Sequence, residues 1–229
     1  AAMVARQASA VAPPYWVTDV ACSDAAPLTY VPTMYFTDVL RRAYPQQLPA
    51  QFKCERIENA AMWRKYRAEC AHIVQVAKAA ASKPCGELGC GVAKGTLAAY
   101  YQLPSPCLPE AAELLSEYYL FHGTSVDAAR AIASFGFDPN RSGDNAGALF
   151  GKGVYFASDV DKALRYARRC LLVARVALGR SAIVTADANR RRPPDHPAGQ
   201  YDSVISDAVP REYLVFSPVK AYAEYIITW

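Results

Sequence analysis

Short apolar runs, each closed by Gly, Pro or a charged turn, recur along the chain from residue 51 to the end. Runs of about four to eight apolar, β-branched and aromatic residues are typical of strands. The pattern predicts strands at 52–58, 118–122, 154–157, 171–178, 202–206, 212–216 and 222–229. Gly123 and Gly179 are expected to end the second and the fourth of these strands.

Stretches rich in Ala, Lys, Arg and Glu lie between these runs and predict helices. The predicted helices span 60–81, 110–116, 127–134 and 161–170. Asn59 suits the N-cap of the first helix, Pro109 the first turn of the second, and Gly136 the end of the third. Short strands interleaved with short helices, followed by a β-rich end, indicate an α+β fold without repeated βαβ units.

The first fifty residues differ from the rest because Ala and Pro are so frequent there. Prolines at this density interrupt helices and strands alike, so residues 1–50 are expected to form an extension with at most short pieces of structure. Residues 51–229 are expected to form one domain, which suits a chain of 229 residues. Gly, Pro and Cys gather in residues 82–108, which predicts a loop insertion.

Composition and charge exclude several classes of protein. A hydrophobic fraction of 52% is enough for a real core and excludes a disordered chain. No uncharged apolar run approaches the roughly 18 residues of a membrane helix, so no membrane span is expected. The net charge of +4 does not indicate a nucleic-acid binder. Residues 141–192 hold eleven Lys or Arg against four Asp, which fits either an anionic ligand or a solvated basic surface.

The cysteines predict neither a disulfide framework nor a metal site. There are seven of them, irregularly spaced, and no secretory signal precedes them, which favours an intracellular protein of the cytoplasm or nucleus. Cys70, His72, Cys85, Cys90 and Cys107 could in principle hold zinc, but no C-x₂-C pair occurs, so free thiols are expected. The chain does not begin with Met and is expected to be a piece of a longer protein.

Two glycine-rich stretches fail as nucleotide-binding loops. Residues 147–153 resemble a Walker A loop, but three residues instead of four separate the first two glycines, and Gly153 stands where Ser or Thr would hold Mg²⁺. Residues 86–95 lack the G-x-G-x-x-G order. P-loop and Rossmann sites are therefore excluded.

Three segments together carry candidate chemistry. The first is His122 followed by Gly123, the second holds Tyr155 and, eleven residues later, Tyr166, and the third begins at Glu212. Each residue has an ordinary structural explanation: a satisfied histidine, core aromatics, or a carboxylate at the start of a strand. In this order the segments resemble the poly(ADP-ribose) polymerase-like ADP-ribosyltransferases, whose His-Tyr-Glu triad falls on His122, Tyr155 and Glu212.

Further motifs extend the resemblance from about residue 51 to the end. Residues 56–63 with Tyr66 are similar to the family's "I-x-N-x-x-L-W-x-x-Y" segment, and residues 192–204 to its loop into a late strand. Residues 222–227 match its terminal "Y-P-E-Y-L-I" strand with Ala in place of Pro. The resemblance implies two small, mainly antiparallel sheets flanked by short helices. Within the family, the sequence is most similar in its organisation to tankyrases and to mono-ADP-ribosylating members that lack a helical regulatory domain.

The resemblance also implies that NAD is the substrate and that nicotinamide is released. Gly123 would offer its backbone N–H and C=O to the nicotinamide amide, since a missing side chain permits close approach. Tyr155 and Tyr166 would wall the nicotinamide ring. Ala163 stands where many members have a Ser that binds this amide, which implies weaker binding of NAD and of benzamide-like compounds.

The remaining implied roles concern the two riboses and the acceptor. His122, assisted by Thr124, would bind the adenosine ribose. Glu212 would bind the nicotinamide ribose, stabilise the oxocarbenium-like transition state and polarise an acceptor hydroxyl. Many mono-transferases replace this Glu, so its presence permits chain elongation. Residues 186–201, with Arg190, Arg191 and Arg192, are expected to select the acceptor.

The sequence therefore predicts an enzyme that transfers one or a few ADP-ribose units to protein side chains, its own included. An inactive NAD-binding or protein-interaction module on the same fold is one alternative, favoured by Ala163. An enzyme similar to RNA 2′-phosphotransferases is another, and with it direct nucleic-acid binding stays open because of the basic stretch. The acceptor residue, the target protein and the polymer length stay open as well.

Overall fold

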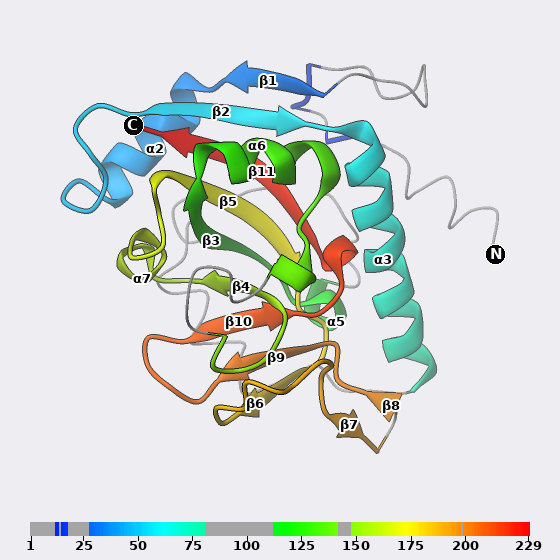
Figure 1. Ribbon diagram of the computed structural model, residues 1–229. Coiled ribbons are helices and arrows are strands. Elements are labelled where there is room, and N and C mark those ends of the chain that lie inside the picture. Colours follow the sequence, from blue (N-terminus) through cyan, green and yellow to red (C-terminus); the bar gives the residue numbers. More distant parts are fainter. Residues whose placement is uncertain (1–11, 14, 18–27, 81–111, 142–147, 198) are drawn as a thin grey trace.

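The computed structural model describes residues 12–13, 15–17, 28–80, 112–141, 148–197 and 199–229 (Figure 1). Its main feature is a nine-stranded sheet with a two-stranded ribbon beside it. In spatial order the sheet holds β1 (Thr29–Pro32), β2 (Lys53–Glu58), β11 (Ala221–Thr228), β5 (Arg169–Ala177), β3 (Glu117–Ser125), β4 (Val154–Ala157), β10 (Glu212–Val215), β9 (Ser203–Ser206) and β6 (Ser181–Val184). The ribbon pairs β7 (Asp195–His196) with β8 (Gly199–Gln200).

Neighbouring strands of the sheet are antiparallel except β6 and β9, which are parallel. This confirms the predicted α+β class with mainly antiparallel strands. The expected division into two small sheets needs correction, because β3 and β4 pair at Phe121 and Ala157 and so join both halves into one sheet. Beyond this pair β3 continues along β5, so the two halves diverge there.

Among the described residues, the helices around the sheet are α2 (Met34–Ala43), α3 (Ala60–Ala79), α5 (Ala112–Leu115), α6 (Val126–Phe135) and α7 (Val160–Leu164). Short 3₁₀ turns span Pro139–Arg141 and Pro218–Lys220. Helix α6 packs on one face, where its alanines meet Leu172 and Ala174 of β5. Helices α2 and α7 pack on the other face, and α3 lies across the ends of β5 and β11 (Figure 1).

Strand β5 lies at the centre of this core because both of its faces are apolar. Leu172 and Val176 point to the α6 side, whereas Leu171 and Val173 point to the α2 side. The sequence of a strand buried on both faces is a nearly continuous hydrophobic run. For this reason the sequence predicts β5 clearly.

The start of α3 confirms the predicted cap. The Asn59 side chain accepts a hydrogen bond from the Met62 N–H at 3.1 Å, as expected of an N-cap. Its amide nitrogen donates to the Ala133 carbonyl of α6 at 2.8 Å, and its backbone N–H donates to the Tyr222 hydroxyl at 3.1 Å. One residue thus links α3, α6 and β11.

Two predicted boundaries are wrong. The helix expected over 161–170 ends at Leu164, and from Arg169 onward the chain belongs to β5. Gly123 does not end β3 but pairs with Leu171 of β5 within a strand that runs on to Ser125. The cause is the same in both cases: strand pairing between β3 and β5 outweighs local preference. The short strand β6 was not predicted at all.

Residues 29–43 form β1 and α2, which belong to the same body as the later strands. Strand β1 pairs with β2, and Phe36 of α2 stacks on Tyr225 of β11 with 3.9 Å between ring centroids. The domain boundary at residue 51 stays a prediction. The predicted insertion at 82–108 lies outside the described residues.

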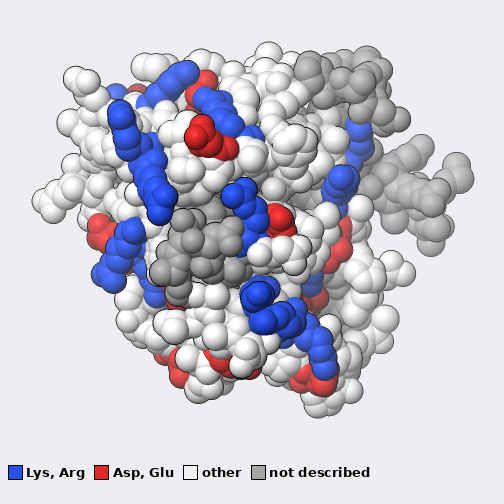
Figure 2. Space-filling model, in the orientation of Figure 1, with Lys and Arg blue, Asp and Glu red and all other residues white. Residues whose placement is uncertain are grey.

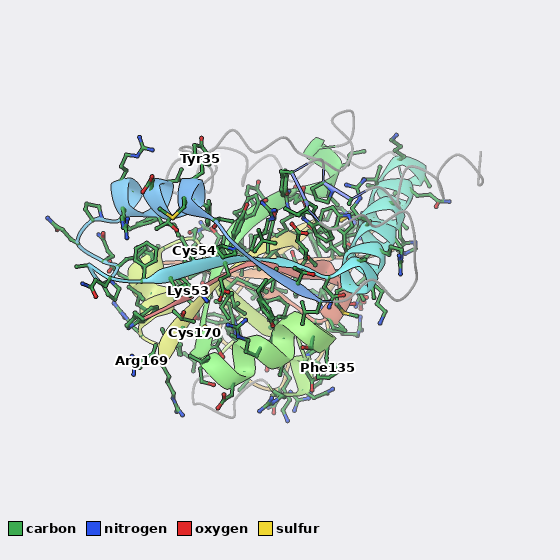
Figure 3. All side chains as sticks on the ribbon, turned by 90° about the horizontal axis from the view of Figure 1, so that it is seen from above. Tyr35, Lys53, Cys54, Phe135, Arg169 and Cys170 are labelled. Atoms are coloured by element: carbon green, nitrogen blue, oxygen red, sulfur yellow. The ribbon has the colours of Figure 1, made fainter. Side chains whose placement is uncertain are left out.

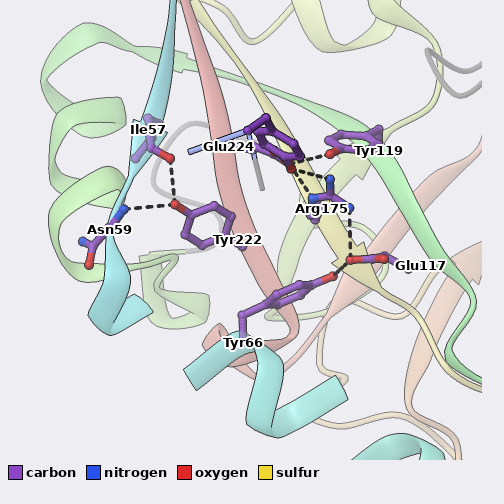
Figure 4. A network of polar contacts seen from close by, with 9 residues as sticks. Ile57, Asn59, Tyr66, Glu117, Tyr119, Arg175, Tyr222 and Glu224 are labelled. Carbon is purple, nitrogen blue, oxygen red and sulfur yellow. Dashed lines mark hydrogen bonds and ion pairs between the residues drawn. The ribbon is translucent and has the colours of Figure 1, made fainter. Parts of the chain in front are cut away.

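A buried polar network crosses the sheet (Figure 4). The Arg175 guanidinium of β5 pairs with Glu224 of β11 and lies 3.6 Å from Glu117 of β3. The hydroxyl of Tyr119 donates to Glu224, and that of Tyr66 donates to Glu117 at 2.6 Å. Charges this deeply buried persist only when paired and hydrogen-bonded. Glu224, the acid of the terminal motif, therefore has a structural role.

The described cysteines are buried and form no disulfide: Cys54, Cys70 and Cys170. Burial raises the pKa of Cys54 and Cys170 to about 12, which keeps both as thiols. Cys85, Cys90 and Cys107, the other candidates for zinc, lie outside the described residues, and within the part of the chain that the structure describes no cluster of metal ligands occurs. Among the described helices, none has the length and hydrophobicity needed to cross a bilayer.

Candidate active site

One row of residues across three strands assembles the site. Phe121 of β3 pairs with Ala157 of β4, and Ala157 pairs with Glu212 of β10. Because paired residues on neighbouring strands lie only about 5 Å apart, this row brings Glu212 of β10 to within two strands of Phe121, the residue before His122. The divergence of β3 from β4 beyond this row opens the sheet at that place.

A cavity of about 370 Å³ occupies this opening, within the range of small-molecule sites. All seven residues singled out from the sequence line it: His122, Gly123, Thr124, Tyr155, Ala163, Tyr166 and Glu212. The residues come from β3, β4, α7, the turn after α7 and β10. The fold thus gathers residues from far apart in the sequence into one site.

The His122 ring has a fixed tautomer. Its Nδ1 lies 2.8 Å from the Tyr155 carbonyl oxygen, and because a carbonyl only accepts, Nδ1 carries the proton. Burial against Phe137 and Phe156 lowers the pKa of His122, with the bond to the Tyr155 carbonyl opposing that shift. The ring is therefore neutral near pH 7, and Nε2 is left as an acceptor suited to a ribose hydroxyl.

Gly123 directs its backbone polar groups into the opening. The carbonyl of Thr124 accepts from the Arg168 N–H at 2.8 Å, on the β5 side of β3. Successive residues of a strand direct their polar groups to opposite sides, so the N–H and C=O of Gly123 point away from β5. They lie two residues beyond the pairing of Phe121 with β4.

The structure gives a different reason for glycine at position 123 than ligand approach. A Cβ there would lie 1.9 Å from the Ala163 carbonyl oxygen and 2.8 Å from the Ala167 nitrogen. Glycine is required because α7 and the turn after it pack directly on β3. The same close contact places Ala163 and Tyr166 beside the exposed backbone of Gly123.

The two tyrosines differ in how firmly they are held. The Tyr155 hydroxyl donates to the Gly151 carbonyl at 2.8 Å and accepts from the Phe150 N–H at 3.0 Å. Burial raises its pKa to about 12, so it stays a donor. Tyr166 is 47% exposed at the mouth of the cavity. Tyr155 is therefore a fixed wall, whereas Tyr166 is an exposed flank.

Ala163 presents only a methyl group to the cavity and is buried. A serine hydroxyl at this position would be available to a ligand bound at Gly123, because the two residues are in contact. The missing hydroxyl noted in the sequence thus falls at the site itself.

Glu212 is a buried carboxylate with a lysine partner. Its side chain is 10% exposed, and Oε1 lies 3.6 Å from the Nζ of Lys162. That ammonium also donates to the Pro210 carbonyl at 2.7 Å, and the Glu212 N–H donates to the Ser206 hydroxyl at 2.8 Å. Sequence reasoning missed Lys162, although it directly precedes Ala163, because a helix over 161–170 gives no sign of facing β10.

Sequence reasoning also missed the residues at the end of the cavity opposite Glu212. It is lined by the end of α6 and the turn that follows: Ile132, Phe135, Phe137, Asp138 and Arg141. Phe135 is 82% exposed and lies at the end of α6 (Figure 3). The segment Gly136-Phe-Asp-Pro-Asn-Arg is the signal that could have identified this end, since it follows the helix that His122 and Gly123 lead into.

The charged residues of the cavity lining are balanced in sign: Arg141 and Lys162 are cations, whereas Asp138 and Glu212 are carboxylates. Lys and Arg side chains gather on the face of the molecule shown in Figure 2, with fewer acidic ones among them. Excess positive charge on one face raises the local concentration of an anionic ligand.

An opened antiparallel sheet with histidine, tyrosines and a carboxylate around one cavity defines the class of ADP-ribosyltransferase-type domains. The family model described as the poly(ADP-ribose) polymerase catalytic domain matches residues 52–203, which is more than half of the chain. The chain belongs to this family. The matched residues include His122, Tyr155 and Tyr166 and end before Glu212, so the place of Glu212 rests on the geometry.

Several curated relatives match parts of the chain. Protein mono-ADP-ribosyltransferase PARP11 of Mus musculus is 30% identical over 142 residues, covering 49% of this chain and 42% of the relative. Protein mono-ADP-ribosyltransferase PARP12 of Homo sapiens is 32% identical over 124 residues, which cover 50% of this chain and 17% of the relative. Protein mono-ADP-ribosyltransferase PARP14 of Homo sapiens is 30% identical over 132 residues, which cover 51% of this chain and 7% of the relative. The chain thus spans less than half the length of these relatives.

Proposed function

We propose that this domain is an NAD-dependent ADP-ribosyltransferase that modifies protein side chains, its own among them, and releases nicotinamide. One observation carries the proposal: the row from β3 through β4 to β10 puts a buried carboxylate, Glu212, and the open backbone of Gly123 into the lining of one cavity. Membership of the family supports the same activity.

Nicotinamide binds between Tyr155 and Tyr166 in this proposal, with its carboxamide on the backbone N–H and C=O of Gly123. The fixed ring of Tyr155 supplies one flat wall, and aromatic contacts of this kind contribute about 1 kcal/mol beyond burial. The neutral His122 accepts a hydrogen bond from the adenosine ribose through Nε2. The adenine then lies toward the end of α6, near Phe135.

Glu212 acts where charge develops. The bond between the nicotinamide nitrogen and the ribose carbon breaks, nicotinamide leaves with the bonding pair, and positive charge grows on the ribose. The carboxylate stabilises that charge and accepts the proton of an acceptor hydroxyl that bonds to the same carbon. Lys162, with its Nζ 3.6 Å from Oε1 of Glu212, holds the carboxylate in place.

Transfer of a single ADP-ribose unit, or of a short chain, fits the relatives, which are named mono-ADP-ribosyltransferases. Glu212 leaves elongation chemically open. The acceptor enters past residues 186–201 in this proposal, a segment in which Arg191 and Arg192 are exposed.

Incubation with NAD labelled in the adenylate portion, followed by a denaturing gel, tests this proposal beside a Glu212→Gln variant. A discrete labelled band that the variant loses supports transfer of one unit, and an upward smear supports a chain. Absence of label from a wild-type protein that still binds benzamide would contradict transfer and favour a binding module.

A further inference from the structure

Residues 149–152 form a short wall segment between two residues that line the cavity, Ala148 and Gly153. The wall segment is held from both sides. On the cavity side the Tyr155 hydroxyl bonds to the Phe150 N–H and to the Gly151 carbonyl. On the outer side lies the turn formed by residues 185–190.

Arg190 makes most of the outer contacts. Its Nη1 donates to the Phe150 carbonyl at 2.9 Å and to the Thr185 carbonyl at 3.4 Å, and its Nη2 lies 3.7 Å from Asp187. Its own carbonyl accepts from the Lys152 N–H at 2.8 Å. The side chain is only 14% exposed, unlike its neighbours in the arginine run.

Close packing makes this contact specific. Gly151 has φ of +122°, and a Cβ there would lie 2.6 Å from the Arg190 carbonyl oxygen. The Asp187 N–H adds a bond to the Leu149 carbonyl at 2.7 Å. The wall segment and the turn at 185–190 therefore behave as one unit.

Phe150 bonds to both Tyr155 and Arg190. Its N–H donates to the Tyr155 hydroxyl, and its carbonyl accepts from Arg190. Its ring packs with Val184 and Leu214. A shift of the arginine therefore reaches the tyrosine hydroxyl through one residue.

We propose that Arg190 is a positioning residue that fixes the Tyr155 wall of the nicotinamide site and ties it to the acceptor-side loop, residues 186–201. This inference rests on the proposed function. It assigns the three arginines different roles: Arg190 faces inward and sets the wall, whereas Arg191 and Arg192 are exposed. Binding of an acceptor at the acceptor-side loop is thereby coupled to binding of nicotinamide.

The test measures the dissociation constants of benzamide and of AMP, which probe the two ends of the cavity, by calorimetry. Arg190→Met keeps the length of the side chain and removes every donor. It is expected to weaken benzamide binding about three- to tenfold and to leave AMP binding unchanged. Arg190→Lys, which keeps a cation and a donor for the Phe150 carbonyl, is expected to restore most of the affinity.

Arg191→Met is the matched control, because the exposed Arg191 guanidinium bonds only to the nearby Ala188 and Arg190 carbonyls among the interactions described. It should bind both ligands like the wild type. Combining Arg190→Met with Tyr155→Phe should cost less than the sum of the two single changes, since both act through Phe150. If Arg190→Met does not fold, Arg190→Gln takes its place.

Benzamide binding by folded Arg190→Met within twofold of the wild type would overturn the inference, as would equal weakening of benzamide and AMP. A wild-type protein that binds benzamide but releases no nicotinamide from NAD would contradict the proposed function alone. A wild-type protein that binds no benzamide would overturn both.

Discussion

Single atoms at the cavity decide what it can bind. A carbonyl of Tyr155 sets which nitrogen of His122 is protonated, and a methyl of Ala163 lies where a hydroxyl could bind an amide. Glu212 has its charge balanced by one ammonium. We therefore expect substitutions of these residues that leave the fold intact to change ligand affinity by graded amounts.

Ala163→Ser is expected to tighten benzamide binding about two- to tenfold, because one added hydrogen bond contributes about 0.5–1.5 kcal/mol net. Titration calorimetry measures the change. Ala131→Ser makes the same substitution at the α6 side of the cavity and should leave the benzamide affinity unchanged. Equal affinities for wild type and Ala163→Ser would show that residue 163 does not face the amide.

Acidification is expected to destabilise the protein through His122. Its folded pKa is lowered by burial, so between that pKa and about 6.5 the unfolded chain binds more protons than the folded one. The free energy of unfolding therefore falls as the pH drops through this window. Urea unfolding of wild type and His122→Asn between pH 5 and 8 checks this, because only the wild type should show this component. A constant difference between the two proteins would contradict it.

The strands and the helix that form this site are closely packed. Helix α7 and its following turn press on β3 so closely that only glycine fits at 123. Strand β10 delivers Glu212 because it pairs with β4, and β4 with β3. The site is thus a consequence of how three strands and one short helix pack.

Gly123→Ala is expected to destabilise the fold by about 1–3 kcal/mol or more, because the added methyl collides with backbone atoms of Ala163 and Ala167. Benzamide binding should fall with it, since α7 must move. Thermal unfolding beside Thr124→Ala, which removes atoms at the next position, measures the effect. Gly123→Ala with wild-type stability would mean that α7 does not pack this way.

Much of the fold could be predicted at this scale. The strands at 154–157 and 171–178 and the helix that begins after Asn59 follow from apolar runs and a side-chain cap. The end of α7 could not be predicted, because residues 161–170 favour a helix locally and only pairing with β3 makes a strand from Arg169. Strand β6 is short and its neighbour β9 is distant in sequence.

The candidate site was predicted in part, through resemblance of motifs in the right order. All seven residues singled out in this way line one cavity, while their roles stay predictions. Lys162 was not predicted, and Arg190 was predicted only to help select the acceptor, because both residues act through long-range contacts, to Glu212 and to Phe150. No local pattern encodes such contacts.

On the scale of the whole molecule, residues 15–17 contact residues that lie far from them in sequence. The hydroxyl of Tyr15 bonds to Glu224 and to Arg175, and the Trp16 ring lies 5.6 Å from that of Trp63. The Val17 N–H donates to the buried Glu58 carboxylate. Residues 15–17 therefore complete the polar network beneath α3.

Trp16→Ala is expected to cost about 2 kcal/mol of unfolding free energy, since a half-buried aromatic in contact with Trp63 and Tyr222 is lost. Val17→Ala is the matched control, because that side chain is 76% exposed and its N–H contact survives. Urea unfolding compares the two. Equal stability of both variants would mean that residues 15–17 are not anchored.

The proposed transfer is tested most directly by the rate of nicotinamide release from saturating NAD, with no RNA present. We expect steady release by the wild type and by Asp207→Asn, which changes an exposed carboxylate in the turn before β10. We expect a fall on the order of a hundred- to ten-thousand-fold in Glu212→Gln, with benzamide binding retained. Release that is equal in wild type and Glu212→Gln, or absent from a wild type that binds benzamide, would contradict the assignment of Glu212 and of the activity.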